Sequence, residues 1–309
     1  MAGITIVSVS YRSTSYLGPL LENLRQKAID PAALRIHVVD NTNGNDLDIA
    51  RLLAAVEGAR LVPFDTGKAR GSRAHALGLD FALRDVETEY AVIVDPDIHV
   101  FLHGWDRLCV AELERHGAFA IGAPYPAWKV GKYHDFPSPP FCFLRVRSFR
   151  ELGAKFVPFG RHRLDDARAL VTRQVGRLGN ALTRRRYERS ALLRRYASWA
   201  EHRLGVFGPD TGWRVAEAAR ARGLKSILFE SALSTADDAA LAAGSEGAPA
   251  ALACLRHEFE LYTYQGQPVM THKYGSGAAP WRTARSNDVA LWRDCIRRVE
   301  NAQTTLGSS

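Results

Sequence analysis

The sequence predicts an α/β fold in which a mostly parallel β-sheet is flanked by helices. In the first 100 residues, short runs rich in Val and Ile alternate with stretches in which apolar residues recur every three or four positions. The first pattern is typical of β-strands and the second of amphipathic helices. Alternation at this spacing indicates parallel strands joined by helical crossovers, with helices on both faces of the sheet. With 309 residues the chain is long enough to bury a sizeable core.

Four strands and three helices are expected in this first part. The second helix begins with acidic residues and ends at Gly58, which are common signals of a helix start and a helix end. The fourth strand is indicated by four consecutive apolar residues, Ala91 to Val94. In chain order, the predicted strands span 4–10, 34–40, 59–64 and 91–94, and the predicted helices span 15–28, 46–58 and 68–83.

The second half of the chain carries the same signals at wider spacing. Helices are predicted at 104–117 and 210–223, the latter closed by a glycine. A strand is predicted from residue 118 into a proline-rich loop, and residues 136–153 predict a loop, a strand through Cys142 to Val146 and a short helix. The remaining expectations are a strand at 224–230, a loop of small residues at 237–251 and a helical tail at 278–309.

Composition excludes several classes of protein. There is no run of about 18 apolar residues, as a membrane-spanning helix requires. The N-terminus lacks the basic segment of a secretory signal. The four cysteines are far apart and form no C-x-x-C pair, which fits buried thiols in a reducing compartment better than a disulfide framework. We therefore expect a cytoplasmic protein with at most peripheral membrane contact.

The positive charge is concentrated in one segment. Residues 161–204 hold twelve arginines against two aspartates and two glutamates, which equals the net charge of +8 of the whole chain. Apolar spacing predicts two helices here, separated near Gly176 to Asn180. A solvated helical face is the common outcome for such a segment. Among functional roles we rank a lid or a homodimer contact first, an anionic membrane surface second and nucleic acid last, because few aromatic residues accompany the arginines.

Polar residues follow the predicted strands at their carboxyl ends. Ser10 and Tyr11 follow the first strand, Asp40 and Asn41 the second, and Asp95 and Asp97 the fourth. In parallel sheets these ends share one edge, where ligands bind, so we expect the side chains to converge on one crevice. Two carboxylates one residue apart repel each other, and a Mg²⁺ or Mn²⁺ ion bound between them would offset that repulsion. The alternative is an ordinary Asp-Pro-Asp turn.

The first half also resembles glycosyltransferase family 2, and within it the rhamnosyltransferase-like branch. The resemblance rests on four motifs in family order, namely VSVSYRS at 7–13, VVDNTNG at 38–44, GSRAHALGLDFAL at 71–83 and VIVDPDIHV at 92–100. Weaker similarity continues through FLRVRSFRELG at 143–153 and PDTGWRVAEAARARG at 209–223. This resemblance implies the GT-A fold, which has a Rossmann-like, mostly parallel sheet, with residues 161–204 as a helical insertion.

The resemblance also implies the roles of individual residues. Asp95 and Asp97 would hold the metal, with His272 completing the site, and Asp95 would also contact the ribose. Asp210, in the D-x-G-W-R motif, would be the catalytic base, although a residue at a helix start is also a common N-cap. The residues expected to contact the nucleotide and its phosphates are Ser10, Tyr11, Arg12, Asp40, Arg70, Arg73, Asp95 and Lys273. One departure is His75, where the family commonly has asparagine, and we assign it no role.

The resulting prediction is an inverting, metal-dependent hexosyltransferase. It would move a sugar from a dTDP- or UDP-linked donor to a hydroxyl or amine of a small-molecule or glycan acceptor. A single domain is expected, with residues 1–100 binding the donor, residues 101–160 and 205–277 forming the acceptor half, then the tail at 278–309. The alternative is a non-catalytic scaffold that binds an acidic partner or nucleic acid through the arginine-rich insertion.

Overall fold

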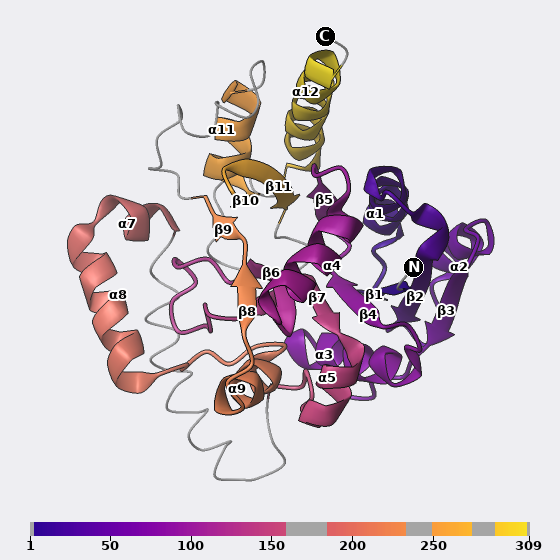
Figure 1. The fold of residues 1–309 in the computed structure, drawn as a ribbon, viewed down its shortest axis with the longest axis horizontal. Coiled ribbons are helices and arrows are strands. Elements are labelled where there is room, and N and C mark those ends of the chain that lie inside the picture. Colours follow the sequence, from indigo (N-terminus) through magenta and orange to yellow (C-terminus); the bar gives the residue numbers. More distant parts are fainter. Residues whose placement is uncertain (1–2, 159–183, 233–248, 274–287, 308–309) are drawn as a thin grey trace.

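The computed structural model describes residues 3–158, 184–232, 249–273 and 288–307 (Figure 1). The first predicted helix of the insertion, most of the loop predicted at 237–251 and the start of the predicted tail lie outside these residues. None of the described helices combines the length and the apolar character that crossing a membrane requires.

A seven-stranded sheet forms the centre of the molecule, in the order β3-β2-β1-β4-β7-β6-β8. Strands β1, β2, β3 and β4 pair in parallel, as do β6 and β8, and only β7 runs antiparallel to its neighbours. The predicted α/β fold with a mostly parallel sheet is therefore confirmed. The strands are β1 (Ile4–Ser10), β2 (Leu34–Asp40), β3 (Ala59–Pro63), β4 (Tyr90–Val94), β6 (Ala120–Pro124), β7 (Pro137–Arg145) and β8 (Ser226–Leu228).

Helices cover both faces of this sheet, and alternate residues of each strand pack on opposite faces. In β1, Ile4 and Ile6 pack with the first group of helices, whereas Val7 and Val9 pack with the second. The first group is α1 (Thr14–Lys27), α2 (Leu47–Ala54) and α4 (Trp105–His116). The second is α3 (Ser72–Ala82), α5 (Val146–Leu152) and α9 (Trp213–Ala221). Short 3₁₀ turns at Pro31–Ala33 and Leu83–Asp85 complete this part.

A second, antiparallel sheet of four short strands was not predicted. Its order is β5-β11-β10-β9, formed by β5 (Ile98–Val100), β11 (Gln267–His272), β10 (Glu260–Tyr264) and β9 (Glu230–Ser231). Helices α11 (Pro249–Glu258) and α12 (Val289–Gly307) stand beside it (Figure 1). Buried residues of both helices, among them Leu255 and Trp292, share a core cluster with Leu261 of β10.

Two helices form the described part of the arginine-rich insertion, α7 (Arg184–Arg189) and α8 (Ala191–Leu204). We call residues 184–204 the arm. The arm lies at the left edge of the molecule in Figure 1, away from the central sheet. Ala197 and Ala200 of α8 are buried, whereas Leu192, Tyr196 and Trp199 are all more than half exposed.

The structure corrects several predicted boundaries. Residues 137–141 belong to β7, although their prolines predicted a loop. The ladder between β4 and β7 ends at Val94 and Phe141, so Pro139 and Pro140 lie beyond it and the sheet needs no N–H group from them. Helix α3 begins at Ser72, after Gly71 with a φ of 55°, rather than at residue 68. Helix α11 begins at Pro249, within the segment predicted as a loop.

Candidate active site

A cavity of about 770 Å³ opens at the carboxyl ends of β1, β2 and β4, beside the first turn of α3. In open sheets with parallel strands, ligands bind at this edge. The residues that line the cavity include Tyr11, Ser13, Asn41, Arg70, His75, Asp95, Asp97, Tyr125, Lys129, Asp210 and His272. The structure therefore brings residues from eight separate stretches of the chain to one place, among them the ends of β1, β2 and β4.

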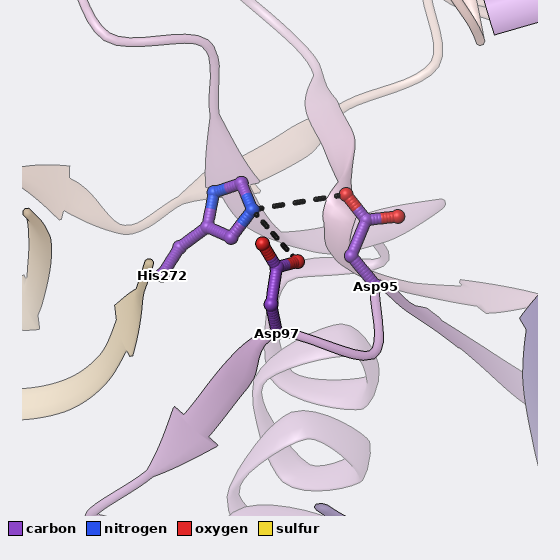
Figure 2. Close-up of side chains that lie close together, drawn as sticks. All are labelled: Asp95, Asp97 and His272. Carbon is purple, nitrogen blue, oxygen red and sulfur yellow. Dashed lines mark ion pairs between the residues drawn. The ribbon is translucent and has the colours of Figure 1, made fainter. Parts of the chain in front are cut away.

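Asp95, Asp97 and His272 lie together in this cavity (Figure 2). Each residue offers one ligand atom, and these atoms all lie within 4.8 Å of one another. His272 Nε2 is 3.3 Å from Asp97 Oδ1 and 3.9 Å from Asp95 Oδ2. Carboxylate oxygens are the ligands that Mg²⁺ and Mn²⁺ prefer, and imidazole binds transition metals. The donor set therefore fits a divalent cation, and its single imidazole favours Mn²⁺ over Mg²⁺.

The second sheet explains how His272 reaches the two aspartates. Asp97 directly precedes β5, and β11 runs antiparallel to β5 with His272 opposite Ile98. The backbone N–H of Lys273 extends this ladder by donating to Asp97 O at 2.9 Å. Because strand register fixes which residues lie opposite each other, the backbone itself holds the imidazole next to Asp97.

His272 is in turn held from behind by a buried carboxylate. Glu260 Oε2 lies 2.8 Å from His272 Nδ1, and Glu260 Oε1 lies 2.7 Å from Lys129 Nζ. Burial alone would raise the pKa of Glu260, but Lys129 and His272 outweigh it and lower the pKa to about 2. Burial would lower the pKa of His272, yet Asp97 and Glu260 raise it to about 10 in the absence of a cation. Bound metal would take the place of the proton on Nε2.

Asp210 lines the same cavity from the loop before α9. Its Oδ2 accepts a hydrogen bond from Lys132 Nζ at 2.7 Å, and its Oδ1 accepts one from Thr211 N at 2.9 Å. Burial would raise the pKa of Asp210, but Lys132 and these hydrogen bonds outweigh it and lower the pKa below its ordinary value. The Asp210 side chain does not cap α9, whose N-cap is Gly212. Capping of the helix therefore does not explain the presence of an aspartate at residue 210.

The glycine of the D-x-G-W-R motif has a clear structural reason. Gly212 has a φ of 88°, and a Cβ atom there would lie 2.5 Å from the Tyr133 hydroxyl. That hydroxyl donates a hydrogen bond to Thr211 O at 2.6 Å, and Gly212 N donates to Phe156 O at 2.8 Å. A side chain at residue 212 would both strain the backbone and displace Tyr133. Gly212 therefore fixes the turn that points Asp210 into the cavity.

The predicted nucleotide-binding residues fall into two groups. Tyr11 and Arg70 line the cavity together with Asp95. Tyr11 is 65% exposed, which leaves its ring available to a ligand.

The other predicted nucleotide contacts lie outside the cavity lining. Asp40 is buried and turned into its own loop, where its oxygens accept hydrogen bonds from Thr42 N and Oγ1 and from Gly44 N, while Asn41 faces the cavity instead. Ser10 is buried, with its Oγ 2.8 Å from Ser13 Oγ. Arg12 and Arg73 are exposed, and the Lys273 ammonium lies 5.6 Å from the ring centre of Tyr16.

Sequence reasoning missed four residues that shape the site. Lys129 and Lys132 lie in the stretch PAWKVGKYHD, between the predicted proline-rich loop and residue 136, where no element or role was predicted. Glu260 begins a strand that was not predicted. His75, which received no role, lies with Nε2 3.4 Å from Asp95 Oδ1. The only sequence signal for a role of Lys129 and Lys132 is that two lysines lie three residues apart in a stretch that also contains Pro and aromatic residues. Glu260 gave none, because its partners come from distant segments.

The arm reaches this region through one carboxylate. Glu201 of α8 accepts a hydrogen bond from Gly131 N at 2.7 Å and lies 3.1 Å from His134 Nε2. Burial lowers the pKa of His134, but Glu201 and the carbonyl of Tyr125 outweigh it and raise the pKa above its ordinary value. Since Lys132 lies between these two contact points in sequence, the arm packs against the loop that carries the partner of Asp210.

No model of a known protein family matches this chain, and no curated protein matches its sequence. Matches exist among solved structures. S. aureus TarS (residues 1–349), in complex with UDP-GlcNAc, is 13% identical with a TM-score of 0.38, and the match covers 50% of this chain and 48% of TarS. The chain thus spans about half the length of that protein.

A second match extends over nearly the whole chain. The mannosyltransferase PcManGT from Pyrobaculum calidifontis, in complex with GDP-Man and Mn²⁺, is 14% identical with a TM-score of 0.44, and the match covers 98% of this chain and 75% of that protein. Because both TM-scores are below 0.5, our description of the fold rests on the strand order of this chain and not on these matches.

Proposed function

We propose that the protein is an inverting, metal-dependent glycosyltransferase of the GT-A class that uses a nucleoside-diphosphate sugar. The observation that carries this proposal is the meeting of Asp95, Asp97 and His272 in one cavity with Asp210. A cation-binding cluster can stabilise a departing diphosphate, and a separate ionised carboxylate can take a proton from the acceptor.

Asp210 is proposed as the general base. In the transfer, the acceptor oxygen or nitrogen forms a bond to the anomeric carbon as the bond from that carbon to the diphosphate oxygen breaks. The acceptor's proton passes to the Asp210 carboxylate, and attack opposite the leaving group inverts the anomeric centre. The lowered pKa of Asp210 supports this role, because the carboxylate is ionised and able to accept a proton at neutral pH.

Asp95, Asp97 and His272 are proposed to hold Mg²⁺ or Mn²⁺, which when bound would stabilise the negative charge on the departing diphosphate. Arg70 at the cavity wall is proposed to contact the same phosphates. Tyr11 is proposed to stack against the nucleotide base. The donor is proposed to be dTDP- or UDP-linked, and the acceptor to be a small molecule or a glycan.

Donor binding and acceptor binding are proposed to belong to different ranges of the chain. Residues 1–100 would bind the donor, and residues 101–160 with 205–277 would supply the acceptor side, because Asp210 and Lys132 both belong to the latter. The arm is proposed to wall the acceptor side or to contact a second copy of the chain. Its docking through Glu201 beside Lys132 supports the first of these roles.

The test is a panel of nucleotide sugars, each incubated with the protein with and without Mn²⁺, while release of nucleoside diphosphate is measured. The expected result is metal-dependent release from at least one dTDP- or UDP-linked sugar, lost in Asp97→Asn. A suitable control is Asp135→Asn, because Asp135 pairs with Arg220 on the surface, outside the cavity lining. Absence of both release and binding across the panel would contradict the proposal.

The exposed arm favours a second candidate function, a scaffold that binds an acidic partner without turnover. Five exposed arginines of the arm flank its exposed Leu192, Tyr196 and Trp199, which would suit such a partner; they are Arg186, Arg189, Arg194, Arg195 and Arg203. The variant Asp210→Asn separates the two functions. Sugar transfer should collapse if the chain is an enzyme, whereas binding of an acidic partner should survive if it is a scaffold.

A further inference from the structure

Lys129 and Glu260 form a buried ion pair on the Nδ1 side of His272, and neither residue has a role in the proposed sugar transfer. Each side chain is only 4% exposed, as is that of His272. The contacts form a continuous chain from the ammonium to the cation cluster: Lys129 Nζ to Glu260 Oε1 at 2.7 Å, Glu260 Oε2 to His272 Nδ1 at 2.8 Å, and His272 Nε2 to Asp97 Oδ1 at 3.3 Å.

The pairing of β10 with β11 determines which side chains of this chain of contacts lie next to each other. Glu260 and His272 are directly opposite each other in the β10–β11 ladder, so their side chains project from the same face. The Tyr262 hydroxyl lies 3.1 Å from Glu260 Oε2 and 3.2 Å from Pro124 O, and its single proton can be donated to either oxygen. The Glu260 carboxylate is thereby fixed on both oxygens, and it cannot turn away from the imidazole.

An imidazole ring can bind a metal through either of its nitrogens, and the hydrogen bond made by the other nitrogen selects which one. Here Glu260 engages Nδ1, which leaves Nε2 directed at Asp95 and Asp97 (Figure 2). A carboxylate on the far nitrogen also makes the imidazole a better metal ligand. A buried ion pair is a weak source of net stability, so its energetic cost is better explained by this orienting contact.

We propose that Glu260 is a positioning residue of the cation site, which holds His272 with Nε2 toward the metal, and that Lys129 holds Glu260 in place. This inference rests on the proposed function only in that it takes Asp95, Asp97 and His272 as metal ligands. It adds that affinity for the cation depends on the hydrogen-bond acceptor at residue 260, although that residue does not touch the cation.

The experiment compares two double variants of similar size, both without a charge at residues 129 and 260. In Lys129→Met/Glu260→Gln, the amide oxygen still accepts a hydrogen bond from His272 Nδ1. In Lys129→Met/Glu260→Leu, no acceptor remains. Because both variants remove the ion pair as a whole, neither leaves an uncompensated charge in the core, which is the usual cause of unfolding after such changes. Circular dichroism and thermal melting check that both are folded.

The measurement is a titration of each protein with Mn²⁺ alone, with free Mn²⁺ followed by electron paramagnetic resonance. We expect the Leu variant to bind Mn²⁺ roughly 10–100-fold more weakly than the Gln variant. Pulsed measurements of the bound ion should show the coupling to a histidine nitrogen in wild type and the Gln variant, and a loss of that coupling in the Leu variant. A merely structural role for Glu260 would not produce this spectroscopic difference.

The outcomes separate this inference from the function on which it depends. Mn²⁺ binding by wild type, with equal affinity and equal nitrogen coupling in the two folded variants, would overturn the inference and leave the function intact. If wild type bound no Mn²⁺ at all, the metal site itself would be refuted, and the inference with it. Release of nucleoside diphosphate from the donor panel tests the catalytic proposal independently of both results.

Discussion

The cavity and the arm are both rich in charge, but they use it in opposite ways. In the cavity and directly behind it, the charged side chains of Asp97, His272, Lys129 and Glu260 are each only 4% exposed and lie against groups of opposite sign. In the arm, Arg186, Arg189, Arg194, Arg195 and Arg203 are exposed and share the surface with the exposed apolar side chains. Burying a charge is costly unless it is paired, so the cavity is the region where each charge needs a specific partner.

The two regions also differ in how their geometry arises. The arm is made of local helical sequence, and a few contacts such as the one made by Glu201 hold it to the body. The cavity is assembled from strand ends, a helix start and a second sheet whose pairing partners are distant in sequence. Substitutions in the cavity should therefore change chemistry strongly, whereas substitutions on the exposed face of the arm should change little.

The largest effect is expected for Asp210→Asn. Asparagine fits the same space but cannot accept the acceptor's proton, so sugar transfer should fall by roughly 10²–10⁴-fold. Affinity for Mn²⁺ should be unchanged, because Asp210 is not in the cation cluster. The measurement is the rate of transfer with a donor that the panel identifies, with Asp135→Asn as the matched control. Transfer within tenfold of wild type would show that Asp210 is not the base.

A smaller effect, dependent on pH, is expected for Lys132→Met. Lys132 helps to lower the pKa of Asp210, so its removal should raise that pKa and move the acidic limb of the pH profile of kcat/KM to higher pH. Activity should thus be lost mainly at the acidic end, where the base becomes protonated. Lys132→Arg keeps the positive charge and should leave the limb close to its wild-type position. An acidic limb that does not move in Lys132→Met would mean that another group controls it.

The contrast between the regions also explains what the sequence could predict. Asp95 and Asp97 were predicted from the residues alone, because a buried strand followed by two acids is a local pattern, and strand ends share one edge of a sheet. His272 and Asp210 were predicted only through resemblance to a family. Their proximity to the cavity depends on the β5–β11 ladder and on the Gly212 turn, which no local periodicity reveals.

The features that the sequence did not reveal have the same origin. Asp40 ends its strand as expected and its carboxylate turns into its own loop, whereas the next residue, Asn41, lines the cavity. The nucleotide contact of Asp40 stays a prediction. Glu260 and Lys129 have no local sequence signature, because each forms its ion pair with a residue that is distant in the chain. The prolines of β7 predict a loop, because the tertiary structure that places Pro139 and Pro140 beyond the β4 ladder has no local sequence signal.

At the contact between the two regions, we expect a modest dependence of stability on pH. The pKa of His134 is raised by Glu201, so the stability from this pair is fully present below the ordinary histidine pKa of about 6.5. It is lost as pH rises through the higher pKa of the folded state. Because both side chains are partly exposed, the contribution should not exceed about 1 kcal/mol.

Glu201→Gln tests this expectation, because the amide oxygen can still accept the hydrogen bond from Gly131 N while the charge is lost. Urea unfolding at pH 6 and at pH 9 gives the free energy of unfolding of both proteins. The loss caused by the substitution should be larger at pH 6 than at pH 9. An equal loss at both pH values would show that His134 is not charged in the folded protein.

The smallest effect is expected on the exposed face of the arm. Trp199 is 58% exposed, so Trp199→Ala should change the free energy of unfolding by no more than about 0.5 kcal/mol. Trp105 is buried and donates from Nε1 to Leu24 O at 2.9 Å, so Trp105→Ala should cost about 3–5 kcal/mol. If Trp199→Ala instead destabilised the protein by a comparable amount and changed its sedimentation, the face would be buried between two copies of the chain. The arm would then resemble the cavity, in that its side chains would be held by specific partners.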